Sequence, residues 1–313
     1  MKEKEITTVY DERYYALLTI KAKDLKQIMC GGEKYVGYIN TVNRPPGKEP
    51  VVIGIFVKEE NYKGKEILLL NRNEIMILNV LFHLTLNAEQ QYIYTDLYNI
   101  HHKLLGRSVK MENEDDYCKI IRTFNRFEKQ YVFIGHESEL QPINNNLYLS
   151  QLANMQVLSV KEKFIRFTLG DFGNEIRNRK RYSDLIPIKF ARCQNISKYF
   201  IALAICRYIY INAKKKNRLY SFKLVTILKQ INYFDRNGNN TGKSYYDLLK
   251  QDGITNKTYI LKQFIKSIKE VLNTLMSESK INGFNLLNFD DNASVLRYTN
   301  YIIELELPPR KYH

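Results

Sequence analysis

One order of elements is predicted twice along this chain: helix, short strand, helix, helix and a two-stranded hairpin. The first set covers residues 71–173 and the second covers residues 195–313, about 127 residues later. In each set a tyrosine and a hydroxyl residue, Tyr94-Thr95 and Tyr220-Ser221, precede a helix whose apolar residues are spaced three and four apart. This period is too long for a solenoid repeat, so the sequence predicts two related domains in tandem.

Apolar spacing and capping residues give the expected bounds of these elements. The first set is predicted as helices at 71–87, 95–105 and 112–130 and a hairpin of 156–160 with 164–169. The second is predicted as helices that open at Asn195 or Ser197 and run through 209, at 221–231 and at 257–279, and a hairpin of 284–289 with 301–307. We expect Thr95 and Ser221 to cap the second helix of each set, and residues 235–243 to form a loop.

The first 70 residues have a different pattern, with short runs of strand-forming residues between turns. The expected strands are 6–10, 14–20, 35–41, 51–57 and 66–70, which predicts a small β-rich unit. Its 12 basic and 10 acidic residues nearly balance, so we expect a contact with a protein, either a partner or a second copy that forms a homodimer. Deletion of residues 1–65 is therefore expected to leave DNA affinity within about tenfold.

Positive charge is concentrated in one part of the chain. The net charge is +15, and residues 174–218 alone carry 12 basic and 2 acidic groups. Such a concentration indicates a polyanionic partner, with nucleic acid favoured over a membrane surface or a merely solvated basic face. The basic residues of this stretch are Arg177, Arg179, Lys180, Arg181, Lys189, Arg192, Lys198, Arg207, Lys214, Lys215, Lys216 and Arg218.

Both predicted third helices carry a polar, basic stripe opposite an apolar one, a pattern typical of a helix with one buried and one exposed face. Arginine can make bidentate contacts with guanine and asparagine with adenine, whereas lysine more often contacts phosphate. Exposed helix faces often carry lysine and arginine without binding DNA, so the repetition of the stripe strengthens the interpretation. The stripes are Lys119, Arg122, Asn125, Arg126 and Lys129 in the first set, and Lys262, Lys266 and Lys269 in the second.

The first predicted hairpin adds three cations, Lys161, Lys163 and Arg166, at its turn and on alternate positions of one strand. Cations in this position can contact the DNA backbone beside a groove. The alternative is a charged edge strand that resists aggregation.

The element order and the charge placement together resemble plasmid and phage replication initiators that have two tandem winged-helix domains joined by a long connecting helix. The resemblance covers roughly residues 71–307 and includes no diagnostic short motif. It implies an α+β fold in which two winged-helix domains, 71–173 and 195–313, follow the β-rich unit 1–70 and are joined by a basic connector, 174–194. It also implies that each third helix enters the major groove of DNA.

Catalytic and cofactor-binding interpretations find little support. The stretch Gly238–Ser244 has three residues between its glycines where a phosphate loop has four, and Asn240 replaces the glycine that a calcium loop needs after Asp235. The adjacent pair His101-His102 points in two directions on a helix, unlike the histidines of a metal-dependent nickase. We therefore expect a binding protein without catalytic activity, cofactor or metal.

Two further features bear on location. The longest apolar run, Tyr199–Ile211, contains Arg207 and is shorter than the roughly 18–20 residues of a membrane span. The first five residues include acidic groups where a signal peptide has a basic patch. We expect a cytoplasmic protein, associated with a nucleoid or plasmid, that makes no membrane contact.

These expectations lead to two functional hypotheses. The first is a sequence-specific double-stranded DNA-binding protein that initiates replication of a plasmid or other mobile element, binding repeated origin sites and recruiting host helicase or other replication proteins. The alternative is a transcriptional regulator or DNA-binding adaptor of a mobile element. Two DNA-reading domains on one chain favour the first, because a regulator usually combines one such domain with a ligand-binding or dimerisation unit.

Overall fold

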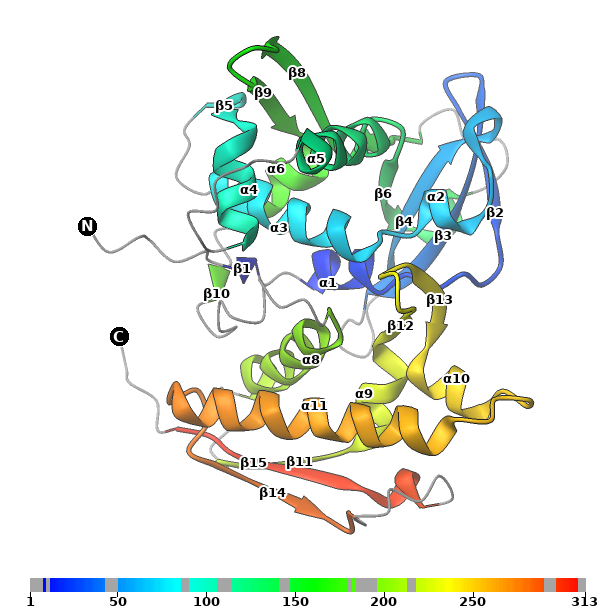
Figure 1. The fold of residues 1–313 in the computed structure, drawn as a ribbon. Coiled ribbons are helices and arrows are strands. Elements are labelled where there is room, and N and C mark those ends of the chain that lie inside the picture. Colours follow the sequence, from blue (N-terminus) through cyan, green and yellow to red (C-terminus); the bar gives the residue numbers. More distant parts are fainter. Residues whose placement is uncertain are drawn as a thin grey trace. The chain divides into compact units, whose positions relative to one another are not determined.

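The fold is described from a computed structural model, which is mixed α+β (Figure 1). The described residues are 8–9, 12–42, 50–85, 90–105, 114–140, 147–178, 182–183, 196–212, 218–289 and 297–308. They divide into two compact units: the first comprises residues 1–183 and 235–242, and the second comprises residues 184–234 and 243–313.

A five-stranded antiparallel sheet forms one part of the first unit. Its strands, in spatial order, are β2 (Lys26–Cys30), β3 (Glu33–Val42), β4 (Val51–Lys58), β6 (Tyr131–His136) and β7 (Ser150–Gln151). The central strand β4 is buried at every residue except Lys58, as expected for a near-continuous apolar run covered on both faces. One core cluster on this sheet contains Ile28, Tyr35, Val52, Phe56, Phe133 and Leu147.

This sheet shows that the predicted boundary at residue 70 was wrong. Val51 to Phe56 of β4 pair in register with His136 to Tyr131 of β6, so strands from both predicted domains form one sheet. Strand β6 was not predicted at all. It follows the third helix after a short turn, and nothing local in its sequence indicates that its partner lies some 80 residues earlier.

Two segments expected to be strands are helices, α1 (Glu12–Leu18) and α2 (Lys65–Leu68). The aromatic and apolar residues of α1 favour a strand locally, but tertiary contacts decide its conformation. The Tyr14 hydroxyl donates a hydrogen bond to Asn79 Oδ1 of α3 at 2.6 Å, and its ring packs edge-on against Phe82. The short strand β1 (Thr8–Val9) pairs with β10 (Tyr182–Ser183).

The rest of the first unit has the predicted element order. It contains α3 (Arg72–Thr85), β5 (Ile93–Asp96), α4 (Leu97–Leu105), α5 (Glu114–Phe127), β8 (Ala153–Ser159) and β9 (Phe164–Leu169), followed by α6 (Asp171–Asn178). The three helices contact one another, and the strands form an antiparallel sheet in the order β5-β9-β8 (Figure 1). Phe124 of α5 packs against Phe167 of β9, which joins the helices to this sheet.

Capping explains where two of these helices begin. The Glu74 amide donates to Asn71 Oδ1 and the Asn71 amide donates to Glu74 Oε2, a reciprocal capping box that starts α3. Helix α4 is capped by Asp96, whose Oδ1 accepts the Asn99 amide at 2.6 Å. The predicted cap, Thr95, lies in strand β5 instead.

The second unit has the same order with an insertion. It contains α8 (Ile196–Asn212), β11 (Leu219–Lys223), α9 (Leu224–Gln230), β12 (Asn232–Phe234), α10 (Tyr245–Lys250), α11 (Lys257–Ser277), β14 (Gly283–Leu287) and β15 (Ile302–Glu306). Of the inserted strand β13 (Asn240–Ser244), residues 240–242 are assigned to the first unit. One-turn 3-10 helices occur at Glu59–Asn61 and Glu137–Glu139 in the first unit and at Tyr298–Asn300 in the second. The sheet order β11-β15-β14 matches β5-β9-β8 of the first unit, because in both the last strand lies between the other two.

The insertion and one cap differ from expectation. Residues 235–243 were predicted as a loop, yet residues 240–243 belong to strand β13, which pairs with β12, and α10 follows with a capping box between Ser244 and Asp247. Ser221, predicted as the cap of α9, lies in β11 and donates a hydrogen bond to Glu304. The N-cap of α9 is Lys223, which makes no side-chain capping bond.

One segment of the first unit is long and apolar enough to cross a membrane by length and composition. It is Lys65–Thr85, which spans α2 and α3, and 61% of its most apolar window is buried within the unit. A core helix passes the same test, so burial accounts for its composition.

Candidate nucleic-acid interface

Helix α5 has one buried face and one polar, exposed face, as predicted. Its buried residues include Ile120, Phe124 and Phe127, which pack toward α3, α4 and the sheet. The 3.6-residue period places the polar residues on the opposite face. The exposed residues there are Lys119, Arg122 and Asn125, and Lys129 follows in the turn after the helix.

Arg126 does not belong to this exposed face, although the sequence placed it there. Its Nη1 lies 2.8 Å from Glu74 Oε1, and its Nη2 donates to the Glu66 carbonyl. The guanidinium is therefore engaged within the first unit, where it ties α5 to α3 and α2. Asn125 and Arg126 are adjacent in the sequence, and helical spacing alone does not show which of the two side chains is exposed.

The partner of Arg126 is a buried carboxylate. The Glu74 side chain is 2% exposed, and burial raises its pKa to about 7 while the nearby Arg126 guanidinium opposes that shift. Gln130 strengthens the same junction, because its Nε2 donates to the Ile67 carbonyl at 2.7 Å. The end of α5 is thus fixed by contacts with α2, a helix that the sequence did not predict.

The start of α5 is fixed to α4. His101 of α4 is buried, and its Nε2 lies 3.4 Å from Asp116 Oδ2 in the first turn of α5. Asp116 also accepts a hydrogen bond from Lys119 at 2.9 Å, the largest factor that lowers the pKa of this carboxyl. These contacts set the angle between the two helices and so the direction in which the exposed face of α5 points.

The cations of the first hairpin have different surroundings. Lys161 is exposed in the turn between β8 and β9. The Lys163 ammonium lies 3.5 Å from the centre of the Tyr117 ring and 3.9 Å from Glu114, and the Arg166 guanidinium lies 4.9 Å from the centre of the Tyr92 ring. Lys161 is therefore the member of this group most clearly directed to solvent.

In the second unit, α11 has the predicted two faces. Its buried face packs on α8, and Lys262, Lys266 and Lys269 are all exposed. Tyr259, 61% exposed in the first turn, and Gln263 extend the same face. Neither residue was predicted from the sequence, although Tyr259 stands three residues before Lys262 and continues its spacing.

Most of the predicted basic connector lies outside the described residues. Arg177 belongs to α6, and nothing is described of its side chain. Arg179, Lys180, Arg181, Lys214, Lys215 and Lys216 are not among the described residues.

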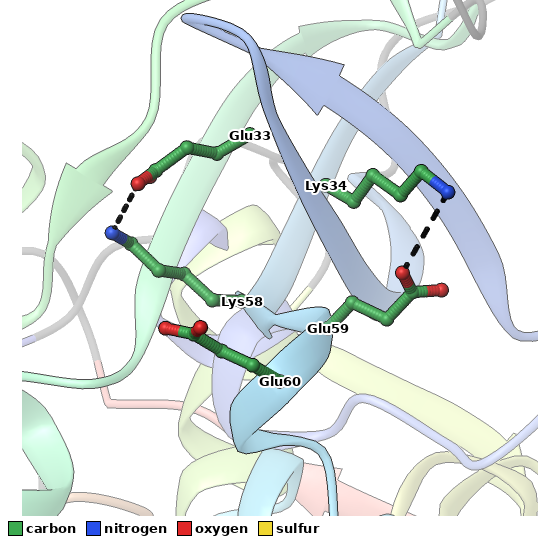
Figure 2. A pocket seen from close by; sticks show the side chains of 5 residues that line it. All are labelled: Glu33, Lys34, Lys58, Glu59 and Glu60. Atoms are coloured by element: carbon green, nitrogen blue, oxygen red, sulfur yellow. Dashed lines mark hydrogen bonds and ion pairs between the residues drawn. The ribbon is translucent and has the colours of Figure 1, made fainter.

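A pocket of about 250 Å³ on the first unit is lined by charged side chains that pair with one another (Figure 2). Glu33 Oε1 lies 2.6 Å from Lys58 Nζ, and Lys34 Nζ lies 4.0 Å from Glu59 Oε2. The hydrogen bond from Lys58 is the largest cause of the lowered pKa of Glu33. Glu60 completes the lining.

Within the described ranges, no group of three histidine, cysteine or acidic side chains is placed to hold a metal ion.

The segment that imitates a phosphate or calcium loop comprises the turn after β12 and strand β13. Asp235 Oδ1 accepts the amides of Asn237 and Asn239, both at 2.9 Å. Gly238 in this turn and Gly242 within β13 have positive φ values of 81° and 72°, which glycine adopts at little steric cost. The segment also bonds to the rest of the first unit, because the Gly238 carbonyl accepts the Arg72 amide and the Thr241 carbonyl accepts a hydrogen bond from the Lys65 ammonium.

Comparisons with known proteins give a limited result. No protein-family model matches the chain, and comparison with curated proteins gives no match. Among solved structures, one of a selenomethionine derivative of domains 2 and 3 of RctB shows a TM-score of 0.49 at 9% identity, with 96% of this chain and 99% of that chain covered. A second structure of RctB domains 2–3 gives 0.45 at 9% identity, with 95% and 96% covered.

Proposed function

We propose that the chain is a sequence-specific double-stranded DNA-binding protein in which each unit contains a winged helix. The main support is a feature that both units share. In both units an exposed polar and basic face lies on the last helix before the antiparallel strand pair, and the three-stranded sheets of both units have the same strand order. A helix so placed is the one that enters the major groove in this class of fold.

The two faces suit different tasks. In α5, Arg122 can bond bidentately to guanine and Asn125 to adenine, while Lys119 and Lys129 lie at the margins for phosphate contacts. In α11 the three lysines are suited to phosphates, which carry no sequence information. The first unit therefore supplies most of the sequence preference and the second supplies much of the affinity.

At the cellular level, the proposal is a replication initiator of a plasmid or other mobile element that acts by binding, without catalysis, and recruits host replication proteins in the cytoplasm. The support is the presence of two candidate DNA-reading helices on one chain, which suits a long site. A transcriptional regulator of a mobile element is the second candidate, favoured by the same faces. Directly repeated sequences of about 20 bases beside the gene distinguish the initiator from the regulator, for which an operator overlapping the promoter is expected.

The test of DNA reading is selection of duplexes from a random library by the full chain, followed by titration of the selected and a scrambled duplex. We expect Arg122→Ala to weaken the selected duplex by ~1–3 kcal/mol and the scrambled one much less. Lys266→Ala is the matched control on the other helix, and it is expected to weaken both duplexes alike. Failure to recover any recurring sequence, or equal losses on both duplexes for Arg122→Ala, would show that α5 does not read bases.

A further inference from the structure

The sheet β5-β9-β8 of the first unit carries exposed aromatic side chains on its outer face. Tyr92 and Tyr94, at the start of β5, are 43% and 51% exposed, and Phe164 of β9 is 36% exposed. Successive side chains of a strand point to opposite faces, so these rings lie opposite the buried set. The buried set is Ile93, Thr95, Ile165 and Phe167.

These side chains form one ordered surface. The Tyr94 and Phe164 rings are stacked, with centres 6.5 Å apart and planes 23° apart. Arg166 pairs in register with Tyr94, and its planar guanidinium lies 4.9 Å from the centre of the Tyr92 ring. Four planar groups, from β9, from β5 and from Tyr92 just before β5, thus form two contacting pairs.

Both signs of charge lie near this surface. Arg166 lies among the rings, and Lys161 is exposed in the adjoining turn. Of the carboxylates, Asp96 accepts the Asn99 amide and Glu114 lies 3.9 Å from the Lys163 ammonium, while Glu162 is exposed beside Lys161 in the turn. Proteins that bind single-stranded nucleic acid combine aromatic rings, on which bases stack, with cations that bind the phosphates.

The second unit provides an internal comparison. Its three-stranded sheet has the same strand order, and by register and alternation its outer positions include Leu219, Ser221, Glu304 and Glu306. The element order alone therefore does not explain the aromatic face of the first sheet.

We propose that this face binds single-stranded nucleic acid, with bases stacked on Tyr92, Tyr94 and Phe164 and phosphates bound by Arg166 and Lys161. A duplex offers the protein only base edges and backbone, because its base faces are covered by neighbouring bases. Only an unpaired strand can present the flat faces that these rings accept. The site goes beyond the proposed duplex binding: it shares Lys161 and Arg166 with the hairpin cations predicted to contact a duplex backbone, but its aromatic rings have no part in that contact.

The test measures binding of the full chain to a fluorescein-labelled 15-nucleotide oligothymidylate by anisotropy. Tyr94→Leu keeps an apolar side chain but removes the ring, and we expect it to weaken binding about tenfold, equivalent to ~1.4 kcal/mol. Tyr94→Phe keeps the ring and is expected to bind within about twofold of the unchanged protein. Tyr148→Leu makes the same change at another exposed tyrosine of the unit and is expected to have no effect. An oligouridylate of equal length shows whether DNA or RNA is preferred.

Two further measurements separate this proposal from others. Duplex binding by Tyr94→Leu is expected to stay within about twofold of the unchanged protein, so loss of duplex binding alone would count against the proposed function and not against this site. Photocrosslinking of the unchanged protein to an oligonucleotide with 5-iodouracil is expected to label the peptides that contain Tyr94 and Phe164. Equal oligothymidylate affinity of the Leu and Phe variants, or crosslinks confined to other peptides, would overturn the proposal. So would a Tyr94→Leu variant that changes only the self-association of the protein, because that result would assign the face to a protein contact.

Discussion

Deletion of residues 1–65 is expected to unfold the first unit. The deletion removes β2, β3 and β4, three of the five strands of one sheet, and leaves β6 without its partner along Tyr131–His136. Burial of one large apolar side chain contributes ~1.5–3 kcal/mol, and a whole domain is stable by only ~5–15 kcal/mol, so the loss of β4 alone exceeds the margin. The sequence alone predicted instead that the deletion leaves DNA affinity within about tenfold, because it placed residues 1–70 in a separate unit.

Amide hydrogen exchange of the full and truncated chains measures this effect. Peptides from 120–136 are expected to lose protection in the truncated protein, while peptides from 261–275 of the second unit keep theirs.

A single substitution checks the cause: a Cβ at Gly37 would lie 2.2 Å from the Ile55 carbonyl oxygen, so Gly37→Val is expected to act like the deletion. Gly283→Val is the matched control, since its Cβ would find its nearest neighbour at 3.4 Å. Retained protection of residues 120–136 after the deletion would mean that β6 and α5 fold without β4.

Arg126→Ala is expected to destabilise the first unit by ~3–5 kcal/mol, because it leaves the Glu74 carboxylate buried without its charged partner. Urea unfolding at pH 8 measures the loss. Arg122→Ala is the matched control, an identical change on the exposed face of the same helix, with an expected effect within ~0.5 kcal/mol.

The pH dependence gives a second check on the Arg126 prediction. Because burial raises the folded-state pKa of Glu74 to about 7, above the ordinary value of 4.5, this group favours folding most at low pH and loses that contribution as the pH rises through 7. Without the Arg126 guanidinium, the pKa of the Glu74 carboxyl is expected to rise further. The carboxyl is then neutral at pH 5, so the variant is expected to be less destabilised at pH 5 than at pH 8. Equal stability of Arg126→Ala and Arg122→Ala would show that the buried ion pair does not hold α5.

Features with a local signal were predictable from the sequence. The apolar spacing of three and four gave α3, α5 and α11 close to their observed bounds, and alternation gave the hairpins β8-β9 and β14-β15. The exposed faces of α5 and α11 followed from the same periodicity.

Features that depend on distant contacts were not predictable in this way. Strand β6 is stabilised by backbone pairing with β4, about 80 residues earlier in the chain. Helix α1 is stabilised by the packing of Tyr14 against α3. Arg126 was misplaced because Glu74 binds it from another helix, a pairing that no spacing within α5 indicates. The aromatic surface was missed because Tyr94 and Phe164 are brought together by register between strands about 70 residues apart.

Exposed cations of both units are expected to bind DNA, and the salt dependence of duplex affinity measures how many of them contact phosphates. Each phosphate contact contributes a slope of about −0.9 to log K against log salt, so ~6–10 contacts predict a slope of about −5 to −9. The double variant Lys262→Ala/Lys266→Ala is expected to make that slope shallower by about 2 on any sequence. A slope of the unchanged protein shallower than about −2, or an unchanged slope in the double variant, would contradict the account.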